Sequence, residues 1–154
     1  MSFERHLQAV VVGLALLLPV AANADDDWVV KASPLPVAET AEKLTDAIEA
    51  AGASVVAVVD HRANARSAGA DLPPAIVVIF GNPAIGTPLM QENLRIAIDL
   101  PQKVLIWQED GSTMVGYVEP GVLAERYGIE ADNKSIDMME QALGKLTDAA
   151  VTAE

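Results

Sequence analysis

The chain has 154 residues, a net charge of −12 and no cysteine. Its length fits a single domain, and its acidity argues against nucleic acid and anionic membrane surfaces, which are bound through lysine and arginine. The absence of cysteine excludes disulfides, c-type haem attachment, thiolate metal sites and thiol catalysis.

The first 24 residues have the pattern of a secretory signal peptide. Arg5 precedes an apolar run over residues 9–20, and Ala22-Asn23-Ala24 supplies the small residues that signal peptidase reads. The run is too short for a comfortable transmembrane helix, which needs about 20 apolar residues; an uncleaved anchor or a buried helix is the alternative. We expect cleavage after Ala24, export to the periplasm or medium, and no membrane association after cleavage.

The first half of the remaining chain predicts strands and one long helix. The expected strands are residues 28–32, 54–60 and 75–80. Apolar residues recur at helical spacing over residues 37–51, and Gly52 ends that helix. Residues 62–72 have the composition of a turn-rich connection. Gly81-Asn82-Pro83 predicts a turn, and Thr87-Pro88 predicts the start of a short helix that ends near residue 93.

The second half predicts more strands and two helices. Ile96, Ile98 and Leu100 alternate with Ala97 and Asp99, which is typical of a half-buried strand. Asp110-Gly111 indicates a hairpin turn. The segments that we expect around and after that turn are strands 104–108 and 113–118, a helix at 120–127 that Gly128 stops, and an amphipathic C-terminal helix.

The order of these elements predicts an α+β fold. A strand, a helix, several strands and a final helix favour an antiparallel-rich sheet with helices on one face. We expect one α+β domain over residues 25–130, on which a C-terminal amphipathic helix within residues 131–154 packs.

Four short motifs resemble one known family. They are Asp60-His61, Phe80-Gly81-Asn82-Pro83, Gly86-Thr87-Pro88-Leu89-Met90 and Asp99-Leu100-Pro101. Together they resemble the bacterial domain-of-unknown-function family 302, most densely over residues 54–128. The resemblance implies a strand-helix-four-strand-helix fold, similar to the TATA-binding-protein-like arrangement and often paired as a homodimer. It brings no established reaction and no catalytic residues.

His61 is the single histidine outside the expected signal peptide. One chain therefore cannot build a tri-histidine or H-E-x-x-H zinc site, and no serine lies in a G-x-S-x-G setting. At the end of a regular strand, Asp60 and His61 should point to opposite faces. Three roles stay open for His61: a hydrogen bond to a loop carbonyl, contact with a ligand or metal, or general-base catalysis.

Three further residues are candidates for a site. Met90 with His61 would suit Cu(I) or an axial position on haem, and Met114, Met138 and Met139 are also available as soft ligands. Methionine is, however, a common core residue as well. Asn82 and Thr87 flank a turn and a helix start, whose N–H groups bind anions; turn and cap chemistry explains them as well. Asp99 is expected to pair with Lys103 or Arg95, or to lie at the sheet edge.

We therefore expect a non-enzymatic periplasmic binding or interaction module that acts as a homodimer. Its candidate ligand site contains His61, Asn82, Thr87 and Met90, and its ligand is a haem, copper or a small anion. Two rivals stay open: a small enzyme with His61 as general base, and a purely structural subunit that binds a protein partner. A cleft with a carboxylate orienting His61 would favour the enzyme, and an exposed apolar sheet patch would favour the structural subunit.

Overall fold

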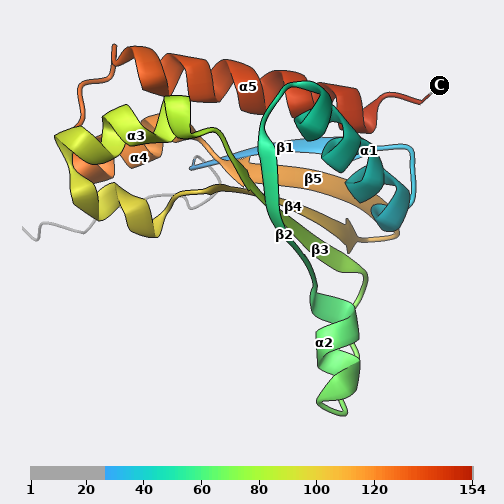
Figure 1. Ribbon diagram of the computed structural model, residues 1–154. Helices are drawn as coiled ribbons and strands as arrows, with labels where there is room; N and C mark the ends of the chain where they lie inside the picture. The colour runs from blue at the N-terminus through green and yellow to red at the C-terminus, as the bar shows by residue number, and fades with distance from the viewer. Residues whose placement is uncertain (1–26, 154) are drawn as a thin grey trace, which may run out of the picture.

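The computed structural model describes residues 27–153, so the expected signal peptide and its cleavage site lie outside the described residues (Figure 1). The elements in chain order are β1 (Trp28–Ser33), α1 (Val37–Ala50), β2 (Ser54–Asp60), α2 (His61–Ser67), β3 (Ala75–Gly81), α3 (Pro83–Glu92), the 3₁₀ helix η2 (Leu94–Ile98), β4 (Gln102–Glu109), β5 (Ser112–Val118), α4 (Pro120–Tyr127) and α5 (Lys134–Val151).

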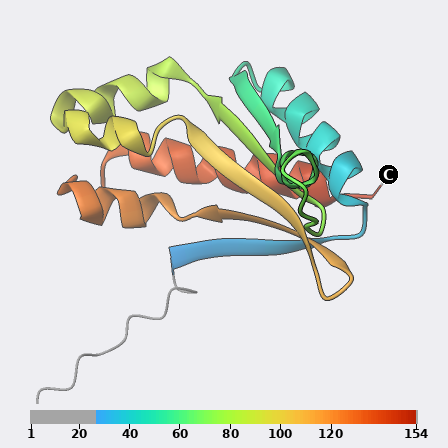
Figure 2. The same ribbon diagram turned by 90° about the horizontal axis from the view of Figure 1, so that it is seen from below.

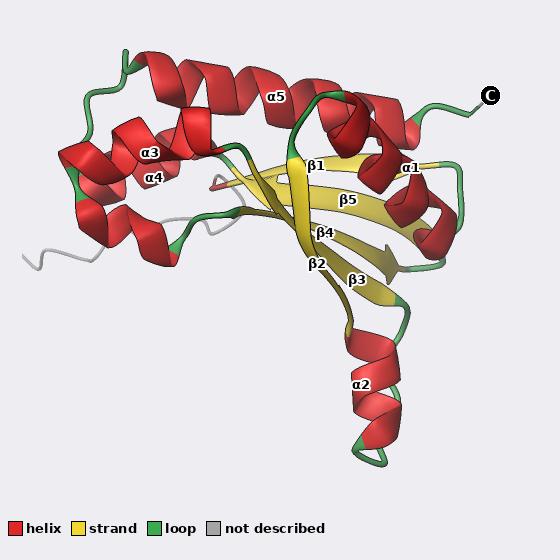
Figure 3. Ribbon diagram, in the orientation of Figure 1, coloured by secondary structure: helices red, strands yellow, loops and turns green. Residues whose placement is uncertain are grey.

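The five strands form one open sheet in the order β1-β5-β4-β3-β2, and every neighbouring pair is antiparallel. Helices α1 and α5 lie side by side across one face of this sheet, while α3, α4 and η2 gather at one end (Figures 1 and 3). The α+β fold expected from the element order is confirmed.

The core lies between the sheet and the two long helices. Leu44 and Ile48 of α1, Leu143 of α5 and Val104 and Ile106 of β4 are buried there. The buried residues of α1 and of α5 recur mostly at spacings of three and four, so each helix turns one apolar stripe toward the sheet. The β4–β5 hairpin closes with Asp110 and Gly111 at φ 48° and 82°, the left-handed pair that a two-residue hairpin turn requires.

Lys31 connects the edge strand β1 to α5. Its Nζ donates to Thr147 Oγ1 at 2.8 Å, to the Gly144 carbonyl at 3.1 Å and to Asp148 Oδ1 at 2.6 Å. The ammonium lies on the helix-covered side, where its three donors are all satisfied. It therefore holds the C-terminal helix against the sheet edge.

The prediction of a turn-rich connection at residues 62–72 is partly wrong, because residues 61–67 form helix α2. Asp60 caps this helix: its Oδ1 accepts a hydrogen bond from the Ala63 N–H at 2.9 Å. No residue of α2 is buried, so the segment lacks the apolar periodicity by which helices are recognised. The helix projects from the sheet on the side opposite α1 and α5 (Figures 1 and 2).

Helix α3 begins earlier than expected. Asn82 is its N-cap, with Oδ1 accepting from the Ala84 N–H at 3.0 Å, and Pro83 is its first residue. Thr87 and Pro88 lie inside the helix instead of opening it. Both Asn82-Pro83 and Thr87-Pro88 satisfy the sequence rule for a cap followed by proline, and the chain uses the first pair.

The strand expected at residues 96–100 is wrong, because residues 94–98 form the 3₁₀ helix η2. Ile96 is fully buried, but Ile98 is 79% exposed. The alternation of apolar residues therefore does not reflect two faces of a strand. The Asn93 side chain caps this turn by accepting from the Arg95 N–H at 3.1 Å.

The second face of the sheet has no helix lying across it within residues 27–153 (Figure 2). The pairing register places Trp28 and Val30, Val77, Leu105 and Trp107 on this side. None of these five is fully buried, and Trp28 and Val30 are 41% and 46% exposed. The face is therefore apolar and open.

A glycine lets two tryptophans pack on this open face. A Cβ at Gly116 would lie 3.0 Å from a ring carbon of Trp107 and 3.2 Å from one of Trp28. A residue with a side chain would force the two rings to shift, so glycine permits this close packing. Across the described part of the chain, no helix is both long and apolar enough to span a lipid bilayer.

Candidate ligand-binding cavity

A cavity of about 650 Å³ lies between α3, α5 and the ends of β2 and β3 where β2 begins and β3 ends. Its wall is mostly apolar. The larger apolar side chains of the wall are Phe80, Ile85, Leu100, Leu143 and Leu146, with Met90, Met138 and Met139. The volume and the apolar wall are those of a small-molecule site.

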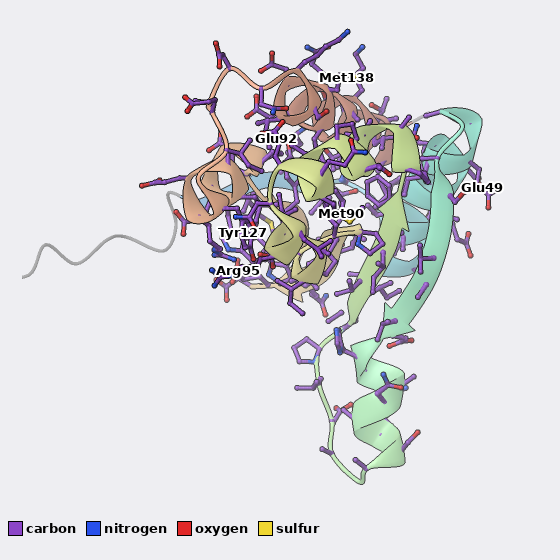
Figure 4. All side chains as sticks on the ribbon, turned by 60° about the vertical axis from the view of Figure 1, so that its left-hand side comes forward. Glu49, Met90, Glu92, Arg95, Tyr127 and Met138 are labelled. Carbon is purple, nitrogen blue, oxygen red and sulfur yellow. The ribbon has the colours of Figure 1, made fainter. Side chains whose placement is uncertain are left out.

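Two helices supply the three methionines. Met90 comes from α3, whereas Met138 and Met139 come from α5, where Met138 is 41% exposed and Met139 is buried (Figure 4). Methionine side chains are flexible and polarisable, so they adapt to guests of different shape. This part of the wall can therefore adopt more than one shape.

Three of the four expected site residues meet at this cavity. Asn82, Thr87 and Met90 all line it, because the end of β3 leads directly into α3. The side-chain oxygen of Asn82 is occupied in capping α3, and Thr87 is exposed on the next turn. Whether these residues contact a ligand stays a prediction.

Gln102 is the one buried polar residue in the wall of this cavity. Its side chain is buried, and Nε2 donates to the sulfur of Met139 at 2.6 Å. This contact joins β4 to α5 and fixes the amide against the wall of the cavity, since a buried polar group needs a partner. Gln102 also borders a second cavity of about 460 Å³.

His61 does not join the other three residues. It is exposed at the start of α2 and lines the second cavity with Val77, Lys103 and Leu105. Asp60 pairs with Ile76, whereas the first cavity begins near Gly81, so the length of β3 separates the two places by about 17 Å at ~3.4 Å a residue. His61 and Met90 therefore do not share a cavity.

Asp99 lies in the second cavity and is part of a small polar cluster. Its Oδ2 accepts from the Tyr127 hydroxyl at 2.6 Å and from Arg126 Nη1 at 3.1 Å. The Tyr127 hydrogen bond, assisted by Arg126 against partial burial, lowers the pKa of the Asp99 carboxyl, and the same bond raises the pKa of Tyr127. The cluster ties η2 to α4.

The ion pair that we expected for Asp99 is therefore formed with a different partner. Lys103 donates to the Asp99 carbonyl at 3.0 Å and not to its carboxylate, while the side-chain contacts come from α4. Within residues 27–153 the ring of His61 makes no hydrogen bond to Asp99 or to another residue, and no three His, Asp or Glu side chains come close enough to hold a metal ion together.

The sequence did not mark several residues that shape the first cavity. Gln141, Ala142 and Lys145 come from α5, which sequence reasoning treated as a packing helix; Met138 and Met139 of the same helix were considered only as further soft ligands beside Met90. One signal was present: Met138 breaks the polar outer face of an otherwise amphipathic helix. Lys145 is the one charged side chain in the wall of this cavity.

The fold and cavity define a small antiparallel α+β domain with an apolar pocket beneath its C-terminal helix. The family model of the domain of unknown function DUF302 matches residues 29–149, and the chain belongs to this family. The resemblance seen in the four short motifs is thereby confirmed.

A solved structure has the same fold. The crystal structure of an uncharacterized conserved DUF302 protein from Bacillus stearothermophilus matches with a TM-score of 0.74 and 22% identity, over 80% of this chain and 98% of that chain. That protein is uncharacterized, and at 22% identity the likeness shows the fold alone.

Curated relatives come from Brucella. The chain is 40% identical over 133 residues to proteins named fluoride-specific ion channel FluC 1, from Brucella suis biovar 1 (strain 1330) and Brucella abortus biovar 1 (strain 9-941). The match covers 84% of this chain, but 52% and 48% of those two proteins. The chain thus spans about half the length of the curated relatives it matches.

Proposed function

We propose that this protein is an exported, non-enzymatic domain that binds a small, mainly apolar ligand in the cavity beneath α5. The observation that carries the proposal is the 650 Å³ cavity with its apolar, methionine-rich wall. A free energy of about 25 cal/mol for each Å² of apolar surface removed from water favours such a guest. Export is proposed from the signal-peptide pattern of residues 1–24.

Blocking the cavity tests the proposal. The probe is N-phenyl-1-naphthylamine, a neutral dye whose fluorescence rises in apolar sites. Ala142 lines the cavity and Ala149 is exposed further along the same helix. We expect saturable binding to the wild type and to Ala149→Phe, and loss of binding in Ala142→Phe at unchanged melting temperature. Absence of dye binding to the wild type, or equal binding by both variants, contradicts the proposal.

Haem and copper belong to the same proposal as particular guests. Because Met90, Met138 and Met139 line one cavity and His61 lines another, a soft metal or haem iron would be held by methionine sulfur. Native mass spectrometry of the protein purified from periplasm reports a retained guest directly. A haem or copper mass that survives in His61→Ala and disappears in Met90→Ala would support this version.

We propose further that the protein forms a homodimer through the open sheet face. At the strand positions 28–32, 57–59, 75–79, 103–107 and 114–118, the side chains on this face include no acid and one base, Lys103. A copy with net charge −12 is repelled least across such a surface. A two-fold contact needs the same patch on both copies, and this one is apolar.

Sedimentation measures the association. We expect the wild type to sediment as a dimer and Val30→Glu, in the open face, to sediment as a monomer. Leu94→Glu is the matched control, because Leu94 is 74% exposed and belongs to η2, not to a strand of the sheet. A monomeric wild type, or a monomeric Leu94→Glu alone, would remove this contact from the proposal.

The Brucella relatives favour a second candidate function, as an accessory domain of a membrane channel. Those proteins are named fluoride-specific ion channels, and the chain matches about half of each. A domain that shares a polypeptide with a channel in relatives is a candidate partner of a separate channel here. Deletion of the gene should then lower the fluoride concentration that stops growth; unchanged growth would count against this function.

A further inference from the structure

The wall of the cavity contains one formal charge, and it is positive. Lys145 stands on the exposed side of α5 and lines the cavity beside Ala142 and Leu146. In a chain with 22 acidic and 10 basic residues, a wall with no carboxylate and one ammonium departs from the overall composition. Resting on the proposed function, this asymmetry indicates which apolar guests the site prefers.

No anionic group within residues 27–153 forms an ion pair with Lys145. The ion pairs found within residues 27–153 use Lys31, Arg62, Arg66 and Arg126, and the hydrogen bonds of lysine side chains come from Lys31, Lys43 and Lys103. The Lys145 stem can lie along the apolar wall while its ammonium stays at the solvent edge. The ammonium is thus available to a guest.

We propose that the cavity takes an amphipathic carboxylate, with its hydrocarbon part against the methionines and its carboxylate at Lys145. The polar side chains of the wall, Ser54, Asn82, Thr87, Gln102 and Gln141, are neutral, so none of them repels an anion. The ligand class is an aliphatic or aromatic carboxylate with one anionic end. It binds from solution and not as part of a membrane.

Three ligands of equal chain length separate charge from hydrophobicity. Decanoate, decan-1-ol and decylamine carry a negative, a neutral and a positive head at pH 7.5, and each is titrated against the bound neutral dye at about 0.15 M salt, where the screening length is ~8 Å. We expect decanoate to displace the dye at the lowest concentration and decylamine at the highest.

Substitution of Lys145 assigns the preference to this residue. Lys145→Met keeps an apolar stem without the charge, and we expect it to weaken decanoate binding about threefold to fivefold, the upper part of the range of a solvent-exposed ion pair, with decan-1-ol unchanged. Lys145→Glu should reverse the order, so that decylamine binds more tightly than decanoate. Lys134→Met is the control, because it removes the same charge from the exposed start of α5 outside the cavity wall.

The outcomes separate the two proposals. Displacement by all three ligands at equal concentrations, unaffected by Lys145→Met, overturns the carboxylate preference but leaves the cavity as a binding site. An equal effect of Lys134→Met shows only long-range charge and also overturns it. Failure of every ligand and of the dye to bind overturns the proposed function itself. If decanoate binds only when it is supplied within phospholipid vesicles, the ligand comes from a membrane, and the proposal that the carboxylate binds from solution is overturned.

Discussion

Replacing Lys31 with methionine should loosen the C-terminal helix from the sheet. The change removes three hydrogen bonds from a side chain that is 24% exposed, while its ionic partner Asp148 is 72% exposed. The exposed ion pair contributes at most about 1 kcal/mol, and the bonds to Thr147 and the Gly144 carbonyl contribute about 0.5–1.5 kcal/mol each. We expect a loss of about 2 kcal/mol in the free energy of unfolding.

Thermal unfolding followed by circular dichroism measures this loss. For a domain of this size, 1 kcal/mol corresponds to about 3–5 °C, so Lys31→Met should lower Tm by about 6–10 °C. Asp148→Asn removes only the exposed ion pair and should cost less than half as much, and high salt should reproduce its effect. Lys134→Met, at an exposed position, is the control. A Tm shift for Lys31→Met below about 2 °C would refute the role given to these contacts.

Three further predictions concern pH and packing. Burial, with two neighbouring carboxylates, raises the pKa of Glu140, so Glu140→Gln should raise Tm at pH 7.5 and lose this gain below the unfolded pKa. The pKa of Asp99 is lowered, chiefly by Tyr127; Asp99→Asn should therefore lower Tm at neutral pH, with the difference vanishing as pH falls through the folded pKa. Gly116→Ala should shift Trp107 and change tryptophan emission, at a cost of about 1–3 kcal/mol. A Tm difference for Glu140→Gln or Asp99→Asn that is the same at neutral pH and at acidic pH would contradict these assignments, as would unchanged emission for Gly116→Ala.

The elements that bury an apolar stripe could be predicted from the sequence. Helix α1 has Leu44 and Ile48 at helical spacing and ends before Gly52, which has a φ of 75°. The β4–β5 hairpin has its left-handed turn at Asp110 and Gly111. In each case local propensity and tertiary burial agree, so the periodicity of the sequence carries the structure.

The elements without such a stripe were missed or misplaced. Helix α2 buries no residue, so only its cap, Asp60, could have marked it. In η2, Ile98 is exposed where an alternating strand would half-bury it. Short segments of this kind are stabilised by capping hydrogen bonds more than by burial. Capping residues are hard to recognise in a sequence, because the motifs are short and common.

The candidate site was partly predictable for a related reason. Asn82 and Met90 are eight residues apart on one connection, so the sequence alone placed them close together. The participation of α5 depends on tertiary packing over more than 40 residues, which no local pattern records. His61 was grouped with them because it lies at a strand end and could share a soft metal or haem with Met90, but the antiparallel β2–β3 pairing puts it at the far end of the hairpin.

Helix α2 makes its helical hydrogen bonds without a buried side chain. A single short helix of this kind is marginally stable in water, so its order depends on whatever lies next to it. Amide hydrogen exchange in residues 61–67 then becomes a gauge of occupancy: fast exchange reports a bare sheet face, and protection reports a neighbour against it. Hydrogen exchange in helix α2 thus reports on assembly without an added label.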